Sequence, residues 1–87
     1  MNMLALRYHK HALKTLAKMP RDIAGKIRKE LALIAADQSV SEGDWKPLAG
    51  SPFWRLRVGG WRAICDIRNH ELVMFVLKIG SRGDIYK

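Results

Sequence analysis

The sequence predicts an α+β fold in which one strand, two helices and three more strands follow one another along a single domain, residues 1–87. Apolar residues recur every three or four positions up to about residue 36, and from residue 53 they alternate with polar ones. The pair Gly59-Gly60 separates two alternating runs, and tight hairpin turns need the positive φ angles that glycine adopts easily. A chain of 87 residues is expected to enclose one small core.

The first strand is expected at Leu4–Tyr8, and the first helix at Lys10–Lys18. In this helix the apolar side chains share one face, and a lysine recurs at every fourth position of another face. These lysines are Lys10, Lys14 and Lys18. The lysine stripe is either a solvated helix face or an edge that contacts phosphate groups.

Met19-Pro20 ends the first helix, and Pro20 suits the start of the next one, where no amide donor is needed. The second helix is expected to extend to about Ala36, with Asp22 near the positive end of its dipole. Its apolar stripe consists of Ile23, Ile27, Leu31 and Ile34. The tight connection makes the two helices antiparallel.

The segment from residue 37 to residue 52 is rich in polar and turn-forming residues and is expected to be a loop. Three strands are expected after it, at Phe53–Val58, Trp61–Ile67 and Leu72–Ile79. The last of them is apolar throughout, as expected for a central strand that is covered on both faces.

The two-residue turn fixes the pairing of the first two of these strands. Arg57 then lies opposite Arg62, and Arg55 lies opposite Ile64 on the same face. The other face carries the set Trp54, Leu56, Val58, Trp61, Ala63 and Cys65. That apolar face suits a cover by the helices, whereas the directly opposed arginines cost up to about 1 kcal/mol.

Two interpretations of the opposed arginines stay open. They either fan out into solvent while their stems cover apolar surface, or they converge on a phosphate group with planar, bidentate donors. Carboxylates of the same chain locked onto these arginines would contradict the second interpretation.

The connection between the last two strands sets a second register. A tight turn at Asn69-His70 would pair Arg68 with Glu71, which is a favourable surface pair of opposite charges. The same register would place Arg62 opposite Leu77, near the strand end that leads into the C-terminal tail.

The C-terminal tail contains Gly80 and Gly83, which are expected to turn it back toward the arginines. Arg82 and Tyr86 would then lie at the edge of the basic cluster. Cations that bind phosphates, together with a ring that stacks on bases, are typical of proteins that bind single-stranded RNA.

The chain has 16 Lys and Arg against 8 Asp and Glu, which gives a formal net charge of +8. Such a charge favours a polyanionic partner, namely nucleic acid, an acidic protein or an anionic membrane surface. The longest apolar run, Leu72–Leu77, is too short to span a bilayer, and the first residues do not form a secretory signal. Cys65 is the one cysteine, so we expect no disulfide and no metal site. We also expect no cofactor, no membrane association and a cytoplasmic location.

Four segments, in this order, resemble the RelE/ParE superfamily of toxins from bacterial toxin–antitoxin pairs: "YHKHALKTLAKMP", "WKPLAG", "WRLRVGGWRAICDI" and "VLKIGSRGDIY". The resemblance covers essentially the whole chain. It implies a small twisted antiparallel sheet of about four strands that is backed by the pair of helices.

For the RelE branch, the resemblance implies a ribosome-dependent endoribonuclease that cuts mRNA in the decoding site. The ribose 2′-hydroxyl would attack the adjacent phosphate, giving a 2′,3′-cyclic phosphate and a free 5′-hydroxyl. The residues that align with the site of that branch are Arg55, Arg57, Arg62, Arg82 and Tyr86. Further contacts to mRNA or 16S rRNA backbone are expected from Lys46, Lys10, Lys14, Lys18, Lys26 and Lys29.

The chemistry suggests a role for each residue of this set. Arg62 and Arg82 would neutralise the charge that develops on the phosphoryl oxygens. Arg55 and Arg57 would hold the RNA backbone in line, and Tyr86 would stack on a base or take part in proton transfer.

Two other functions stay open on the sequence. The ParE branch implies a protein that inhibits DNA gyrase without RNA chemistry, and a third reading is an RNA-binding relative with little catalysis. Many relatives carry a histidine where this chain has Ser81, and His9, His11 and His70 are expected to be surface residues. In all three cases we expect an acidic, partly disordered antitoxin as partner in a hetero-oligomer.

Overall fold

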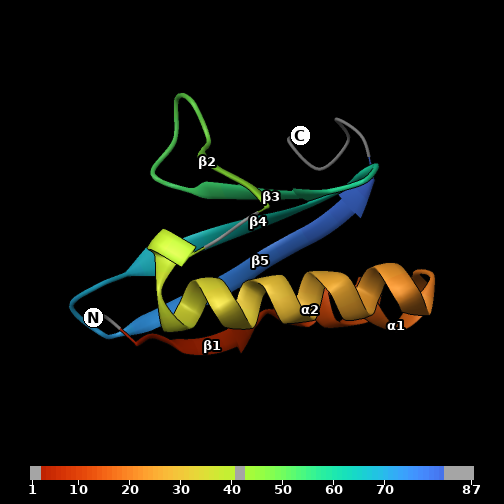
Figure 1. Cartoon of the computed structure of the whole chain (residues 1–87), viewed down its shortest axis with the longest axis horizontal. Helices are drawn as coiled ribbons and strands as arrows, with labels where there is room; N and C mark the ends of the chain where they lie inside the picture. Colours follow the sequence, from red (N-terminus) through yellow and green to blue (C-terminus); the bar gives the residue numbers. More distant parts are fainter. Residues whose placement is uncertain (1–2, 41–42, 82–87) are drawn as a thin grey trace.

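The computed structural model describes residues 3–40 and 43–81 (Figure 1). Its elements are β1 (Ala5–Tyr8), α1 (Lys10–Lys18), α2 (Arg21–Ala36), the 3-10 helix η1 (Gln38–Val40), β2 (Asp44–Pro47), β3 (Trp54–Val58), β4 (Trp61–Arg68) and β5 (Val73–Ser81). The predicted α+β class is confirmed, and the predicted elements occur in the predicted order with one added strand, β2. Neither helix in these two ranges is long and apolar enough to cross a membrane.

The five strands form one sheet in the order β1-β5-β4-β3-β2. This differs in two ways from the expected four antiparallel strands. β1 pairs with β5 in parallel, and because no local turn joins these strands, the sequence pattern does not fix their relative direction. The second difference is β2, which lies in a segment that the sequence predicts to be a loop. The strand is only four residues long and contains Asp44 and Pro47, residue types that are rare in strands, so its sequence does not indicate a strand. Its place at the edge of the sheet is where proline is tolerated.

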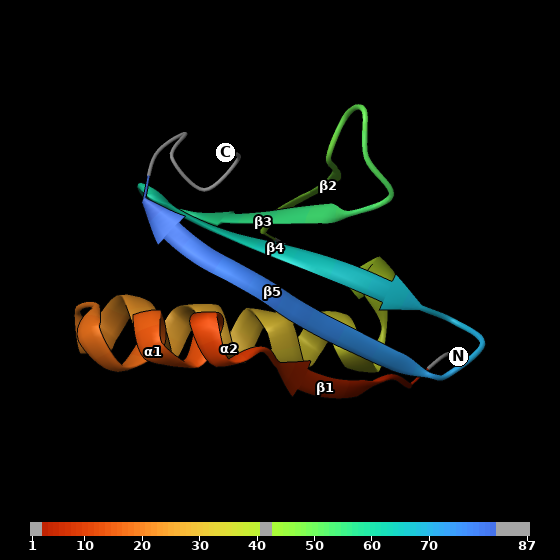
Figure 2. The same cartoon turned by 180° about the vertical axis from the view of Figure 1, so that it is seen from behind.

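The two helices run antiparallel beside β1 and β5, while the β2–β3 end of the sheet extends beyond them (Figures 1 and 2). α1 is capped by His9, whose Nδ1 accepts a hydrogen bond from the His11 amide at 3.3 Å. α2 begins after Pro20 and has Asp22 in its first turn, where a negative charge suits the helix dipole.

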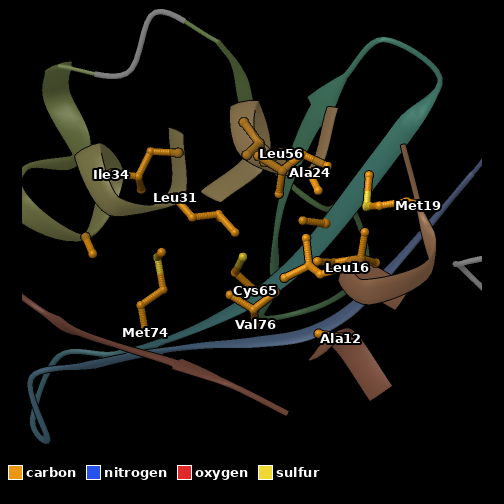
Figure 3. Packing of buried hydrophobic residues seen from close by; sticks show 14 of the residues in the cluster. Ala12, Leu16, Met19, Ala24, Leu31, Ile34, Leu56, Cys65, Met74 and Val76 are labelled. Atoms are coloured by element: carbon orange, nitrogen blue, oxygen red, sulfur yellow. The ribbon is translucent and has the colours of Figure 1, made fainter. Parts of the chain in front are cut away.

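The core lies between the helices and the sheet. Leu31 and Ile34 of α2 are 0% exposed, as are Cys65 of β4 and Val76 of β5. Figure 3 shows side chains of the helices and of the strands converging on this region. Among the described residues, the cluster consists of Leu4, Ala12, Leu16, Met19, Ala24, Ile27, Leu31, Ile34, Ala35, Leu56, Ala63, Cys65, Met74, Val76 and Ile79. The predicted apolar stripe of α2 is therefore buried, apart from the half-buried Ile23 at its beginning.

The β3–β4 hairpin has the predicted register. Arg57 lies opposite Arg62, and Leu56 lies opposite Ala63. Gly59 adopts a φ of 59°, which is the positive value that the tight turn requires. Leu56 and Ala63 are both buried and face the helices, so one side of the hairpin is fixed by the core.

The predicted register between β4 and β5 is wrong. Arg62 lies opposite Gly80 rather than Leu77. The turn after β4 is longer than the two residues expected, and the ladder contains a bulge in which Leu77 has no partner on β4. Because one inserted residue reverses the faces of a strand, Val76 and Ile79 are both buried in the core.

Leu72, in the turn before β5, adopts a φ of 54°, which a Cβ atom disfavours, and it is 54% exposed. We expect Leu72→Asn to raise the free energy of unfolding by about 1 kcal/mol, because asparagine tolerates this conformation better. Urea unfolding measures the change. The matched control is Leu13→Asn, since Leu13 is 46% exposed within α1, where asparagine is disfavoured. Equal changes in the two variants would contradict backbone strain at Leu72.

Burial raises the pKa of the Cys65 thiol to about 12, from an ordinary value of 9.0. The folded protein should therefore resist thiol labelling at about pH 8 and should react once unfolded, because the thiolate is the reactive form. A pKa that is higher in the folded state means that this contribution to stability is intact below about pH 9 and is lost as the pH rises toward 12. Time-resolved labelling with and without denaturant tests this, and labelling at the unfolded rate under native conditions would rule it out.

Candidate nucleic-acid interface

The side of the sheet that faces away from the helices carries Arg55 and Arg57 from β3 and Arg62 from β4, and we call it the arginine face. These positions alternate with apolar residues that point into the core. Burial of the apolar side chains on one face of the hairpin therefore places the arginines on the opposite face. Arg57 is exposed and lies directly opposite the half-buried Arg62. On the other side of Arg62 the opposing residue is Gly80, which has no side chain to fill the adjoining space.

Arg55 is bound by a carboxylate of its own chain. Its Nη1 donates to Oδ2 of Asp44 at 3.3 Å, and its Nη2 donates to Oδ1 at 3.2 Å. The Arg55 side chain is 17% exposed and the Asp44 side chain is 34% exposed, so the fork is partly open to solvent. Binding of phosphate by the arginines requires that no carboxylate of the same chain already holds them, and Arg55 does not meet this requirement. Arg57 does meet it, because it makes no hydrogen bond or ion pair with the described residues.

The Arg55 guanidinium, through its hydrogen bonds, holds the pKa of the Asp44 carboxyl below its ordinary value of 3.8, and the charges of Lys46 and Arg57 lower it further. Asp44 lies opposite Arg57 in the ladder and reaches Arg55 diagonally. Sequence reasoning missed Asp44 because its segment was expected to be a loop. The signal that could have found it is the alternation of polar, apolar and polar residues at Asp44, Trp45 and Lys46.

The structure does not bring all the predicted lysine contacts together. Lys46 of β2 has a side chain that is 68% exposed, and its Nζ lies 4.0 Å from Oδ1 of Asp44, beside the arginine face. The lysine stripe of α1 is exposed on the other side of the sheet. It consists of Lys10, Lys14 and Lys18. These lysines therefore form a surface that is separate from the arginine face.

Arg82 and Tyr86 lie outside the described residues. His9, His11 and His70 are exposed, as expected from the sequence. Within the described part of the chain, no group of three or more His, Cys, Asp and Glu side chains is placed to hold a metal ion.

The end of the arginine face that is distant from the Gly59-Gly60 turn is occupied by internal interactions. Arg68 binds Asp66 at 3.1 Å and Glu71 at 3.5 Å, and its guanidinium carbon lies 4.8 Å from the ring centroid of Phe75. The expected Arg68–Glu71 ion pair is therefore present, although the two residues are not ladder partners. The candidate interface lies at the other end, next to the glycine turn.

An open groove of about 380 Å³ adjoins this end of the sheet. Its lining residues come from α2, from β3 and from the residue that precedes β2: Lys26, Lys29, Glu30, Gly43, Arg57 and Val58. Through Arg57, the groove connects the arginine face to two exposed lysines of α2. The sequence suggested that these lysines contact RNA backbone, but it did not place them next to Arg57.

Asp44→Asn is expected to lower the free energy of unfolding at about pH 7, because it removes the charge that Arg55 binds. The pKa of Asp44 is depressed in the folded state, so its carboxylate stabilises the fold above pH 3.8 and loses this effect as the pH falls through the lower folded value. In urea unfolding, the difference between the natural chain and the variant should shrink at about pH 2. Arg55→Gln in the Asp44→Asn background should add little, and fully additive losses would contradict the fork.

The sequence matches the family model described as "ParE toxin of type II toxin-antitoxin system, parDE" over residues 6–86. No curated protein sequence matches the chain significantly.

Solved toxin structures have a similar fold. The archaeal RelE–RelB complex from Pyrococcus horikoshii OT3 aligns with a TM-score of 0.79 and 22% identity, covering 94% of this chain and 98% of that one. The RelBE2 toxin–antitoxin complex from Mycobacterium tuberculosis aligns with a TM-score of 0.77 and 20% identity, covering 97% of both chains. The intact RelBE complex of E. coli gives 0.73 and 22%, covering 91% of this chain and 96% of that one. The structures establish the fold, and the family model, which spans nearly the whole sequence, establishes the lineage: the chain belongs to the ParE toxin family of type II toxin–antitoxin systems, within the RelE/ParE superfamily.

Proposed function

We propose that this toxin is a ribosome-dependent endoribonuclease that cuts mRNA and thereby inhibits translation. The observation that supports this most is the pair Arg57 and Arg62, which lie directly opposite each other on the side of the sheet that the helices leave open. Opposed cations disfavour the sheet by up to about 1 kcal/mol on their own. A phosphodiester group bound between them would turn this repulsion into attraction, with charge-assisted hydrogen bonds to both guanidinium groups.

In the proposed reaction, the ribose 2′-oxygen attacks the adjacent phosphorus while the bond from phosphorus to the 5′-oxygen breaks. The products are a 2′,3′-cyclic phosphate and a free 5′-hydroxyl. Arg62 would neutralise the charge that grows on the phosphoryl oxygens, and Arg57 would hold the backbone in line. Both side chains stay protonated, so they act by position and charge rather than by proton transfer.

Arg55 takes a different role in this proposal from the one expected on the sequence, because Asp44 holds it. The fork ties β2 to β3 and so steadies the strand that carries Arg57. Lys46, exposed beside Asp44, is proposed to contact an RNA phosphate. Arg82 and Tyr86 keep the roles that the chemistry suggests: Arg82 neutralises charge on the phosphoryl oxygens, and Tyr86 stacks on a base or takes part in proton transfer. On the ribosome, contacts to 16S rRNA are proposed for the stripe of α1: Lys10, Lys14 and Lys18.

A second candidate function is inhibition of DNA gyrase without RNA cleavage. The specific observation in its favour is that the matching family model is the ParE one. The similar solved structures are of RelE toxins, but at 18–22% identity they support the fold and do not discriminate between the two functions. Cleavage mapping on translating mRNA, run beside supercoiling and DNA-break assays on gyrase, separates the two candidates.

We further propose that an antitoxin with an acidic segment neutralises this chain. The formal charge of +8 favours such a partner. The similar structures from Pyrococcus horikoshii, Mycobacterium tuberculosis and E. coli are toxin–antitoxin complexes, which supports the same arrangement here. A segment that folds onto the arginine face would mask the proposed RNA contacts.

Arg57→Ala and Arg62→Ala are each expected to abolish growth arrest when the chain is expressed without an antitoxin, and to reduce cleavage of translating mRNA at least a hundredfold, as for the loss of a preorganised charge. Arg7→Ala is the matched control, since Arg7 is exposed on β1 at the opposite edge of the sheet. Circular dichroism and thermal unfolding show whether each variant is folded. Folded Arg57→Ala and Arg62→Ala variants that still arrest growth would overturn the assignment of the site.

A further inference from the structure

The groove beside Arg57 carries two further cations, Lys26 and Lys29, that the proposed reaction does not use. Lys26 and Lys29 lie on α2 and are exposed, and Arg57 reaches the same groove from β3. None of these three cations makes an ion pair with a carboxylate in the part of the chain that the structure describes. The groove therefore presents three cationic side chains around one open space.

Glu30 lines the same groove, and one of its oxygens lacks a hydrogen-bond partner. Its Oε1 is shielded from solvent, and no described group donates to it. The shielding comes partly from Gly43, because a Cβ atom at that position would lie only 2.7 Å from Oε1. A shielded acceptor without a donor is unfavourable, so a ligand that brings a donor would be stabilised here.

The two observations together define the ligand. It must carry an anionic group for Lys26, Lys29 and Arg57, and a hydrogen-bond donor next to that group for Glu30. A ribonucleotide unit has this combination, because its 2′-hydroxyl lies beside a backbone phosphate. A deoxyribonucleotide has the phosphate without the hydroxyl, and the 2′-hydroxyl is the group by which proteins distinguish RNA from DNA.

We propose that this groove is a ribose-reading subsite for an RNA strand, in which the phosphate lies among Lys26, Lys29 and Arg57 and the 2′-hydroxyl donates to Glu30. The site requires the Glu30 side chain, which lines the groove, to turn its Oε1 out of the shielded position toward the bound hydroxyl. The inference rests on the proposed function, since the strand continues through Arg57 onto the arginine face. An acidic peptide fits less well, because its carboxylates would approach Glu30 with like charge.

The test compares binding of the full chain to a short single-stranded RNA and to the DNA of the same base sequence, measured by fluorescence anisotropy. The natural chain should prefer RNA by roughly ten- to a hundredfold, which is what one hydrogen bond to a charged group supplies. Glu30→Gln and Glu30→Met form a matched pair, since both remove the charge and only glutamine keeps an acceptor oxygen. The preference should persist in Glu30→Gln and vanish in Glu30→Met.

Gly43→Ala is an independent variant that changes no charge. Its methyl group would displace the Glu30 carboxyl, which can move because it is the end of a flexible side chain. The preference for RNA should fall in this variant too, and thermal unfolding confirms that the protein is folded.

The lysines give a second readout. Lys26→Ala and Lys29→Ala should weaken RNA and DNA binding equally, and each should lower the slope of log affinity against log salt by about 0.7, the value for one phosphate contact on a single strand. Arg7→Ala, at the opposite edge of the sheet, should leave the RNA preference unchanged.

The failure of this inference can be told apart from the failure of the proposed function. If mRNA is cleaved but Glu30→Met keeps the preference for RNA, the subsite is wrong and the nuclease stands. If no mRNA is cleaved but the preference depends on Glu30, the subsite stands and the nuclease is wrong. If an acidic peptide binds through Lys26 and Lys29 while RNA does not bind, the groove is a peptide site and the inference is overturned.

Discussion

The register of the β3–β4 hairpin is the constraint on which the rest of the structure depends. With a two-residue glycine turn, Leu56 and Ala63 meet on the side of the helices, and Arg57 and Arg62 meet on the other side. A slip of one residue would bring the arginines into the core and expose Leu56. The burial of Leu56 and Ala63 and the opposition of the two arginines therefore follow from the same register.

The parts of this fold that a short-range signal specifies could be predicted from the sequence, and the parts that depend on distant pairing could not. The helices follow from apolar spacing, and the hairpin follows from Gly59-Gly60. The β4–β5 register could not be predicted, because it depends on the bulge at Leu77 and on the positive φ of Leu72. Neither position carries a glycine or asparagine that would indicate such a conformation. The same holds for β2, which is too short and too poor in strand-forming residues to be recognised.

The candidate site was predictable to the same extent. The opposition of Arg57 and Arg62 follows from counting outward from the turn. The capture of Arg55 by Asp44 does not, because it requires β2, whose alternation covers too few residues to identify a strand. The proximity of Glu30 to Arg57 requires the packing of α2 against β3, which no local pattern contains. The two carboxylates next to the hairpin thus differ: Asp44 forms an ion pair with Arg55, whereas Oε1 of Glu30 has no hydrogen-bond donor among the described residues.

The parallel pairing of β1 with β5 has a consequence for how the chain is made. Ala5 to Tyr8 pair with Val73 to Val76, so the first strand to be synthesised finds its only neighbour in the described sheet in the last one. Contacts between such distant segments form late, since a long stretch of chain must be ordered before they close. While a nascent chain still holds β5 within the ribosomal exit tunnel, this sheet is incomplete. The five-stranded sheet can therefore close only after β5 has left the tunnel and met β1.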